Sequence, residues 1–270
     1  MNIQQFSDKF RKYSDGIMPV LFVGHGNPMN AIEDNEFSRG WGLMGKQLPL
    51  PKAILCVSAH WETKGTKVTA MEKPETIHDF GGFPQALFDV QYNAPGSPEF
   101  ATETQKLITH KNIELDYEWG LDHGCWSVLN KMFPEATIPV YQLSLDYTAT
   151  PQQHYDLAKQ LSALRKKGVL IIGSGNMVHN LRLFQMTDKA FDWALEFDAT
   201  LKELIEKGDH QSIINYEKLG KAAQLSIPTN EHFVPLLYSL ALQDKKDILS
   251  FFNDKTTAGS ISMRSLVFTQ

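Results

Sequence analysis

Three apolar runs of one kind constrain the fold of this 270-residue chain more than any other feature. Each run is rich in Val, Ile and Leu, and each carries a histidine at or just beyond its C-terminal end. The runs read PVLFVGHGNP at 19–28, AILCVSAHW at 53–61 and GVLIIGSGNMVHN at 168–180. A strand that is apolar without alternation is typical of a sheet covered on both faces. The runs therefore predict an α/β protein with a buried, largely parallel sheet.

Further elements are predicted between and after these runs. Strands are expected at 67–71, 113–117, 138–145 and 260–268, the last as an edge strand, and helices at 98–108, 126–132, 151–167, 188–207 and 229–242. A strand–helix–strand unit over 138–172 predicts a right-handed crossover, which places ligands at the carboxyl ends of the strands. No linker, repeat or low-complexity segment divides the chain, so we expect a single domain over residues 1–270.

A long loop is expected between residues 72 and 98, because this stretch is rich in Gly and Pro. It carries Phe80, Phe83, Phe88 and Tyr92, which are too many aromatic residues for a disordered linker. A wall or lid over a site and simple packing against the sheet are equally open interpretations.

The composition disfavours several partners. The formal net charge of −5 gives no basic field for nucleic acid or anionic membranes. No apolar run approaches the roughly 20 residues that span a bilayer, and the polar N-terminus does not resemble a signal peptide. Two cysteines cannot form a disulfide framework. We therefore expect a soluble cytoplasmic protein, for which a homo-oligomer is an open possibility.

The nine histidines divide by context. His25, His60, His123 and His179 lie in glycine-rich or strand-end contexts, and His232 is expected in the first turn of a helix. Neutral imidazoles arriving from separate strand ends are suitable ligands for a divalent transition metal. For His25 a turn histidine is the alternative, and for His123 a helix cap made together with Asp122. Three others lie in polar surroundings and are expected at the surface: His110, His154 and His210.

Motifs that would indicate nucleotide binding or a serine or cysteine nucleophile are weaker than the histidine pattern. Gly173-Ser174-Gly175 lacks the third glycine of a dinucleotide fingerprint, and Ile172 stands where a nucleophile elbow needs glycine. Cys56 lies within an apolar strand and is expected to be inert. Cys125, close to His123 in the sequence, is a weak candidate for a nucleophile pair.

Seven motifs, in order along nearly the whole chain, resemble the class III extradiol ring-cleaving dioxygenases, specifically the branch acting on 3,4-dihydroxyphenylalanine (DOPA). They are GHGNPM at 24–29, VSAHWET at 57–63, IHDFGGFP at 77–84, YNAPGSP at 92–98, GLDHGCW at 120–126, GSGNMVHNL at 173–181 and PTNEHFVPLLY at 228–238. The resemblance implies a three-layer α/β/α fold and one non-haem Fe(II) ion, with zinc as another metal that histidines would bind.

Roles for individual residues also follow from the resemblance. It implies that His25 and His60 are metal ligands, that His179 is the acid/base residue or a further ligand, and that His123 lies near the substrate. Relatives that cleave protocatechuate use a glutamate as third ligand, whereas this chain has Glu231 followed by His232. We expect His232 to be the ligand.

The implied reaction is O2-dependent cleavage of a catechol ring beside the two hydroxyls, giving a product of the muconic semialdehyde type. A zinc-dependent hydrolase on the same scaffold is the alternative, since zinc also activates water. A metal-binding protein without enzymatic activity is a third interpretation.

Overall fold

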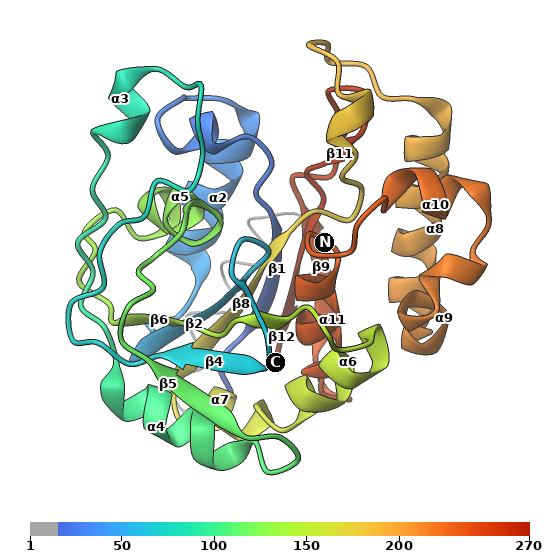
Figure 1. Cartoon of the computed structure of the whole chain (residues 1–270). Coiled ribbons are helices and arrows are strands. Elements are labelled where there is room, and N and C mark those ends of the chain that lie inside the picture. Colours follow the sequence, from blue (N-terminus) through green and yellow to red (C-terminus); the bar gives the residue numbers. More distant parts are fainter. Residues whose placement is uncertain (1–15) are drawn as a thin grey trace.

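The computed structural model describes residues 16–270, and a six-stranded mixed sheet lies at its centre (Figure 1). In spatial order the strands are β6 (Val140–Gln142), β2 (Ala53–Ser58), β8 (Val169–Gly175), β1 (Val20–Gly24), β12 (Ser265–Thr269) and β9 (Ile248–Phe252). The first four are parallel, and β12 is antiparallel to both β1 and β9. This arrangement confirms the predicted α/β fold with a largely parallel sheet.

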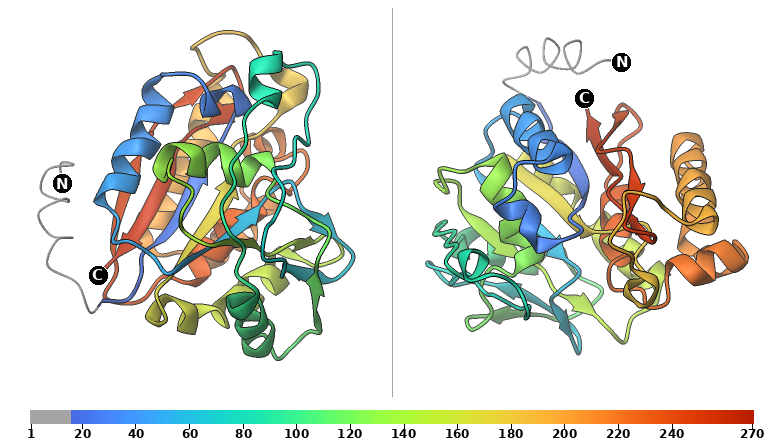
Figure 2. Two further views of the ribbon diagram at one scale, coloured as in Figure 1. Left: turned by 90° about the vertical axis from the view of Figure 1, so that its left-hand side faces the viewer. Right: turned by 90° about the horizontal axis from the view of Figure 1, so that it is seen from above.

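Helices cover both faces of the sheet, which gives three layers (Figures 1 and 2). One face packs against α2 (Glu36–Gln47) and α5 (His123–Met132). The other face packs against α11 (Val234–Ala241) and α6 (Pro151–Lys159), with α8 (Asp192–Lys207) beyond the β12 side. The remaining helices are η1 (Pro28–Ala31), α3 (Gln85–Phe88), α4 (Pro98–Leu107), α7 (Ser162–Lys166), η2 (Leu181–Leu183), α9 (His210–Ile214), η3 (Tyr216–Lys218) and α10 (Lys221–Ser226).

Three short strand pairs lie outside the central sheet. They are β4 (Thr66–Thr69) with β5 (Ile113–Asp116), β3 (Glu62–Thr63) with β7 (Leu145–Asp146), and β10 (Thr256–Thr257) with β11 (Ile261–Ser262). Within residues 16–270, no helix combines the length and the apolar character that crossing a membrane requires.

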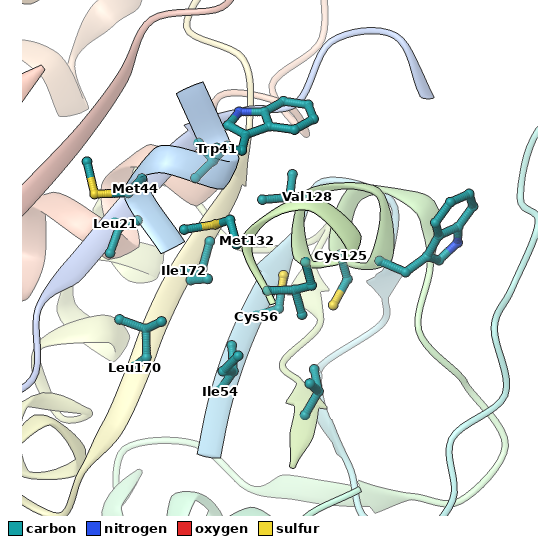
Figure 3. Close-up of a cluster of buried hydrophobic side chains, with 14 of the residues drawn as sticks. Leu21, Trp41, Met44, Ile54, Cys56, Cys125, Val128, Met132, Leu170 and Ile172 are labelled. Carbon is teal, nitrogen blue, oxygen red and sulfur yellow. The ribbon is translucent and has the colours of Figure 1, made fainter. Parts of the chain in front are cut away.

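The strands are apolar throughout because successive side chains serve opposite layers. On β1, Leu21 and Val23 belong to the core under α2 and α5, whereas Val20 and Phe22 face the α11 side. Figure 3 shows the first of these cores, where strand residues such as Leu21 meet side chains from α2 and α5. Burial of each such side chain contributes on the order of 1.5–3 kcal/mol, so both faces of β1 stabilise the fold.

The parallel strands end at one level. Gly24 of β1 is paired with Gly175 of β8, and Ser58 of β2 is paired with the adjacent Ser174. The residues that follow β1, β2 and β8 therefore emerge side by side at the carboxyl edge of the sheet, where open α/β sheets bind ligands.

Several sequence expectations were wrong in detail. The strand expected over 138–145 divides into β6 and β7, and that over 67–71 forms β4 outside the central sheet. The expected edge strand, β12, lies inside the sheet because the unpredicted strand β9 covers it. His154 was expected at the surface, but it is only 3% exposed. Its Nδ1 lies 3.0 Å from the Tyr238 hydroxyl in a buried contact.

Candidate active site

The five histidines singled out in the sequence line one pocket of about 500 Å³ at the carboxyl edge of the parallel strands. His25 directly follows β1, His60 lies two residues after β2, and His179 lies four residues after β8. His123 begins α5, and His232 lies in the turn before α11. The helix expected over 229–242 begins only at Val234, two residues after His232, yet the histidine still reaches the pocket.

His25 and His60 approach each other through their ring nitrogens. Their Nε2 atoms are 3.1 Å apart. The Ser174 hydroxyl donates to the Gly124 carbonyl at 2.5 Å and lies 3.0 Å from His25 Nδ1. A hydroxyl has one proton, so Ser174 accepts from His25 Nδ1–H. The Nε2 atom of His25 then keeps its lone pair, which faces His60.

His232 has a similar arrangement. Its Nδ1 lies 3.1 Å from Glu231 Oε1, which also accepts a hydrogen bond from the Thr229 hydroxyl at 3.0 Å. An ionised carboxylate can only accept, so Nδ1 carries the proton and Nε2 is free. The ring stacks on that of His179, with centroids 3.5 Å apart and planes 10° apart.

The His123 ring is next to the His60 ring, with centroids 3.8 Å apart, and its centroid is 5.8 Å from that of His25. Its Nδ1 is 2.9 Å from Asp79 Oδ2, and its backbone N–H donates to Asp79 Oδ1 at 2.8 Å. Asp122 is the N-cap of α5 and accepts from the Cys125 backbone N–H. The cap interpretation of Asp122 is thus confirmed, and His123 lines the pocket as well.

Burial lowers the pKa values of four of these histidines. The pKa falls to about 3 for His60, where the neighbouring His123 adds to burial, and to about 4 for His179. It falls well below the usual value for His25 and His232, where burial acts with the other imidazoles of the cluster. Their imidazoles are therefore uncharged at neutral pH, the form that a metal ligand requires.

The donor set fits a divalent transition metal. Ligand atoms of His25, His60 and His123 all lie within 4.8 Å of one another, and so do those of His179, Glu231 and His232. The His232 ring is also close to the first pair, with centroids 5.2 Å from His25 and 4.9 Å from His60. Nitrogen ligands at about 2.0 Å from one tetrahedral ion are roughly 3.3 Å apart. The 3.1 Å between the Nε2 atoms of His25 and His60 matches that spacing.

The walls of the pocket above the histidines are apolar. Phe80 and Phe83 come from the long loop, so for these two residues the wall interpretation is confirmed; Tyr92 packs in the core instead. Leu181, Phe184 and Met186 line the pocket from the segment after His179. Met186 is 97% exposed, and Leu181 and Phe184 are also exposed.

Two residues of this region had no recognised signal in the sequence, namely Asp79 and Ser174. Both act through hydrogen bonds to histidines that are distant in the chain, so no fixed spacing reveals them. The nucleophile pair proposed for Cys125 gains no support. Cys125 is buried in the core between β2 and α5 (Figure 3), and burial raises its pKa well above the usual value.

A parallel sheet that delivers several uncharged imidazoles to one apolar-walled pocket defines a metal-dependent α/β enzyme. The chemistry follows from comparison with known proteins. Residues 20–264 match the family model described as the catalytic LigB subunit of aromatic ring-opening dioxygenase. The chain belongs to this family and is a metal-dependent extradiol ring-cleaving dioxygenase.

Similar proteins include one named 4,5-DOPA dioxygenase extradiol from Escherichia coli (strain K12), which is 46% identical over 92% of this chain and 94% of its own length. A protein of the same name from Beta vulgaris is 37% identical over 94% of this chain and 98% of its own. Among solved structures, an uncharacterized Escherichia coli K12 protein is 39% identical with a TM-score of 0.79, covering 93% of this chain and 99% of its own.

Proposed function

We propose that this enzyme cleaves the ring of DOPA or a related catechol with O2, beside rather than between the two hydroxyls. The observation that carries the proposal is the convergence of imidazole nitrogens at the base of an apolar pocket. The names of the similar proteins from Escherichia coli and Beta vulgaris support the choice of catechol.

Three residues would hold the metal in this proposal: His25, His60 and His232. Each is uncharged, and the hydrogen bonds of His25 to Ser174 and of His232 to Glu231 leave the Nε2 lone pairs free. One divalent ion per chain is expected, with Fe(II) for activity, and the same nitrogens would also bind zinc. When bound, the ion supplies Lewis acidity that favours the ionised catechol, and Fe(II) supplies the redox chemistry that O2 requires.

His179 is the proposed acid/base residue. Its low pKa keeps the imidazole uncharged at neutral pH, so it can accept a proton from a catechol hydroxyl and return it later. His123 is proposed to hydrogen-bond the substrate from the other side of the pocket. Phe80 and Phe83 on one wall and Phe184 on another would hold the ring and exclude water.

The chain is proposed to form one catalytic domain over residues 1–270. Within the described part, β1 near the start pairs with β12 near the end. Histidines from the first half of the chain (His25, His60 and His123) and from the second half (His179 and His232) line the same pocket. The zinc-dependent hydrolase considered from the sequence gains no support from the similar proteins.

Oxygen consumption tests the proposed function. Protein loaded with Fe(II) without oxygen and then mixed with DOPA, or with other catechols, should take up O2 and give a yellow ring-opened product. The matched control is the same protein loaded with zinc, which should take up none. Absence of oxygen uptake by the Fe(II) protein across the catechol panel would refute the proposal.

A further inference from the structure

Asp79 binds the first residue of α5 through both carboxylate oxygens. Its Oδ1 accepts the His123 backbone N–H at 2.8 Å, and its Oδ2 lies 2.9 Å from Nδ1 of the same residue. Asp79 is therefore fixed at the N-terminus of a helix whose first N–H groups have no partner within the helix. The side chain is only 15% exposed, so water competes little for these contacts.

The contact selects one form of the His123 ring. An ionised carboxylate accepts hydrogen bonds and cannot donate them, so Nδ1 must carry a proton to bind it. An aspartate carboxyl ordinarily ionises well below neutral pH, and the two donors of His123 favour the ionised form of Asp79. In its uncharged form the His123 ring is then restricted to the tautomer whose Nε2 has a lone pair. An imidazole without such a partner exchanges between two tautomers.

The same carboxylate oxygen also faces His60. Oδ2 lies 3.6 Å from His60 Nδ1, which is too long for a hydrogen bond but close enough for electrostatic attraction. Asp79 Oδ2 thus faces the Nδ1 atoms of two adjacent rings, whereas His60 uses its Nε2 atom for the contact with His25. Its loop neighbour Phe80 contacts the His123 ring edge-on, with centroids 5.5 Å apart.

We propose that Asp79 is a positioning residue that holds His123 in the Nδ1–H tautomer, so that Nε2 faces the pocket as a hydrogen-bond acceptor. A catechol hydroxyl is a donor of the kind that this nitrogen would receive. The assignment of the ligand as a catechol rests on the proposed function, whereas the tautomer does not depend on it. Carboxylates that fix a histidine in this way are known to control catalysis without taking part in bond making.

Asp79→Asn is the decisive variant because its amide can accept at only one position. If the amide oxygen keeps the bond to the His123 backbone N–H, its NH2 group faces Nδ1 and favours the opposite tautomer, with the proton on Nε2. Asp79→Glu keeps the carboxylate and should restore part of the wild-type behaviour. Asp209→Asn is the matched control, since Asp209 also accepts one backbone N–H and one side-chain donor, both from Ser212 and far from the pocket.

The first measurement is the tautomer of His123, read from the ¹⁵N chemical shifts of the ring in zinc-loaded protein. We expect Nδ1–H in the wild type and in Asp209→Asn, and Nε2–H in Asp79→Asn. A wild-type ring protonated on Nε2 would overturn the proposal even if the variant failed to fold. An unchanged tautomer in folded Asp79→Asn would do the same.

The second measurement separates positioning from metal loss. Asp79→Asn should bind one metal ion per chain, and its kcat with Fe(II) and a catechol should fall by about 10²–10⁴-fold with a much smaller change in KM. Equal kcat values for Asp79→Asn and Asp209→Asn would refute the catalytic consequence. If the wild type consumes no O2 while the tautomer switches as expected, the proposed function fails and the role of Asp79 stands.

Discussion

At the scale of single residues, three of the five histidines of the pocket share one arrangement. His25, His123 and His232 each have Nδ1 directed at an acceptor of the protein, respectively Ser174, Asp79 and Glu231. The other nitrogen is thereby free to face the pocket. Acceptors behind ligating histidines typically change metal affinity by 10–100-fold, so Ser174 and Glu231 are expected to affect metal binding through the proposed ligands His25 and His232.

Substitution of His232 and His179 should separate ligand from acid/base residue. We expect His232→Ala to lose stoichiometric metal, whereas Glu231→Gln should bind metal about 10–100-fold more weakly. His179→Ala should keep one metal ion per chain while kcat falls by about 10²–10⁴-fold. Metal analysis of protein purified without oxygen provides the measurement.

Two results would contradict these assignments. Full metal content in His232→Ala, together with loss in His123→Ala, would transfer the third ligand to His123, whose donor atoms also group with those of His25 and His60. Loss of metal in His179→Ala would make His179 a ligand.

At the scale of elements, the ends of strands and the start of α5 are packed too closely to admit extra atoms. A Cβ at Gly124 would lie 2.5 Å from Ser58 Oγ and 2.8 Å from His60 Cδ2. The first turn of α5 therefore supports the residues after β2, and a shift of either element would move His60. Glycine is required here for close approach rather than for an unusual backbone conformation.

Gly124→Ala is expected to weaken metal binding at least tenfold, because the new methyl group displaces the His60 ring. Gly42→Ala is the control, since Gly42 also lies in a helix and its Cβ would meet only the Lys131 carbonyl at an ordinary 3.5 Å. The control should be neutral or stabilising by about 0.5–1 kcal/mol, as expected for removal of a helical glycine. Metal titration of both variants gives the comparison, and equal affinities would show that the approach of α5 to His60 is unimportant.

The elements that could be predicted from the sequence are those whose formation depends on residues within the same short segment. Val20–Gly24 and Ala53–Ser58 are continuous apolar strands, and Gly208, with φ of 69°, ends α8 as expected. The strand β9 reads ILSFF and was missed because periodicity alone cannot assign so short an apolar run to a strand. Asp79 and the buried position of His154 depend on contacts between distant segments, which no local pattern reveals.

At the scale of the whole molecule, buried uncharged histidines make stability depend on pH. Besides the four histidines of the pocket, His154 has a pKa lowered to about 4 by burial. In the unfolded chain a histidine binds a proton near pH 6.5. Between pH 6.5 and 4 the unfolded state therefore binds more protons than the folded state, and the free energy of unfolding falls as the pH falls.

His154→Asn should reduce this dependence in the metal-free protein. A histidine with pKa values of about 6.5 unfolded and about 4 folded contributes roughly 2 kcal/mol of stability that is lost between pH 7 and 5. Asparagine keeps a donor near the Tyr238 hydroxyl and does not titrate. Urea unfolding at both pH values should show a smaller loss in the variant, and identical losses would contradict the assignment.

The pairing of β1 with β12 has a consequence for how the enzyme is made. Gly24 and Ser265 are hydrogen-bonded although 241 positions separate them in the chain, so the contact order is high and folding is expected to be slow. During synthesis one edge of β1 has no partner until residues 265–269 leave the ribosome. Because His25 follows that strand directly, we expect the enzyme to acquire its metal after translation rather than on the nascent chain, and chaperones to shield the open edge meanwhile.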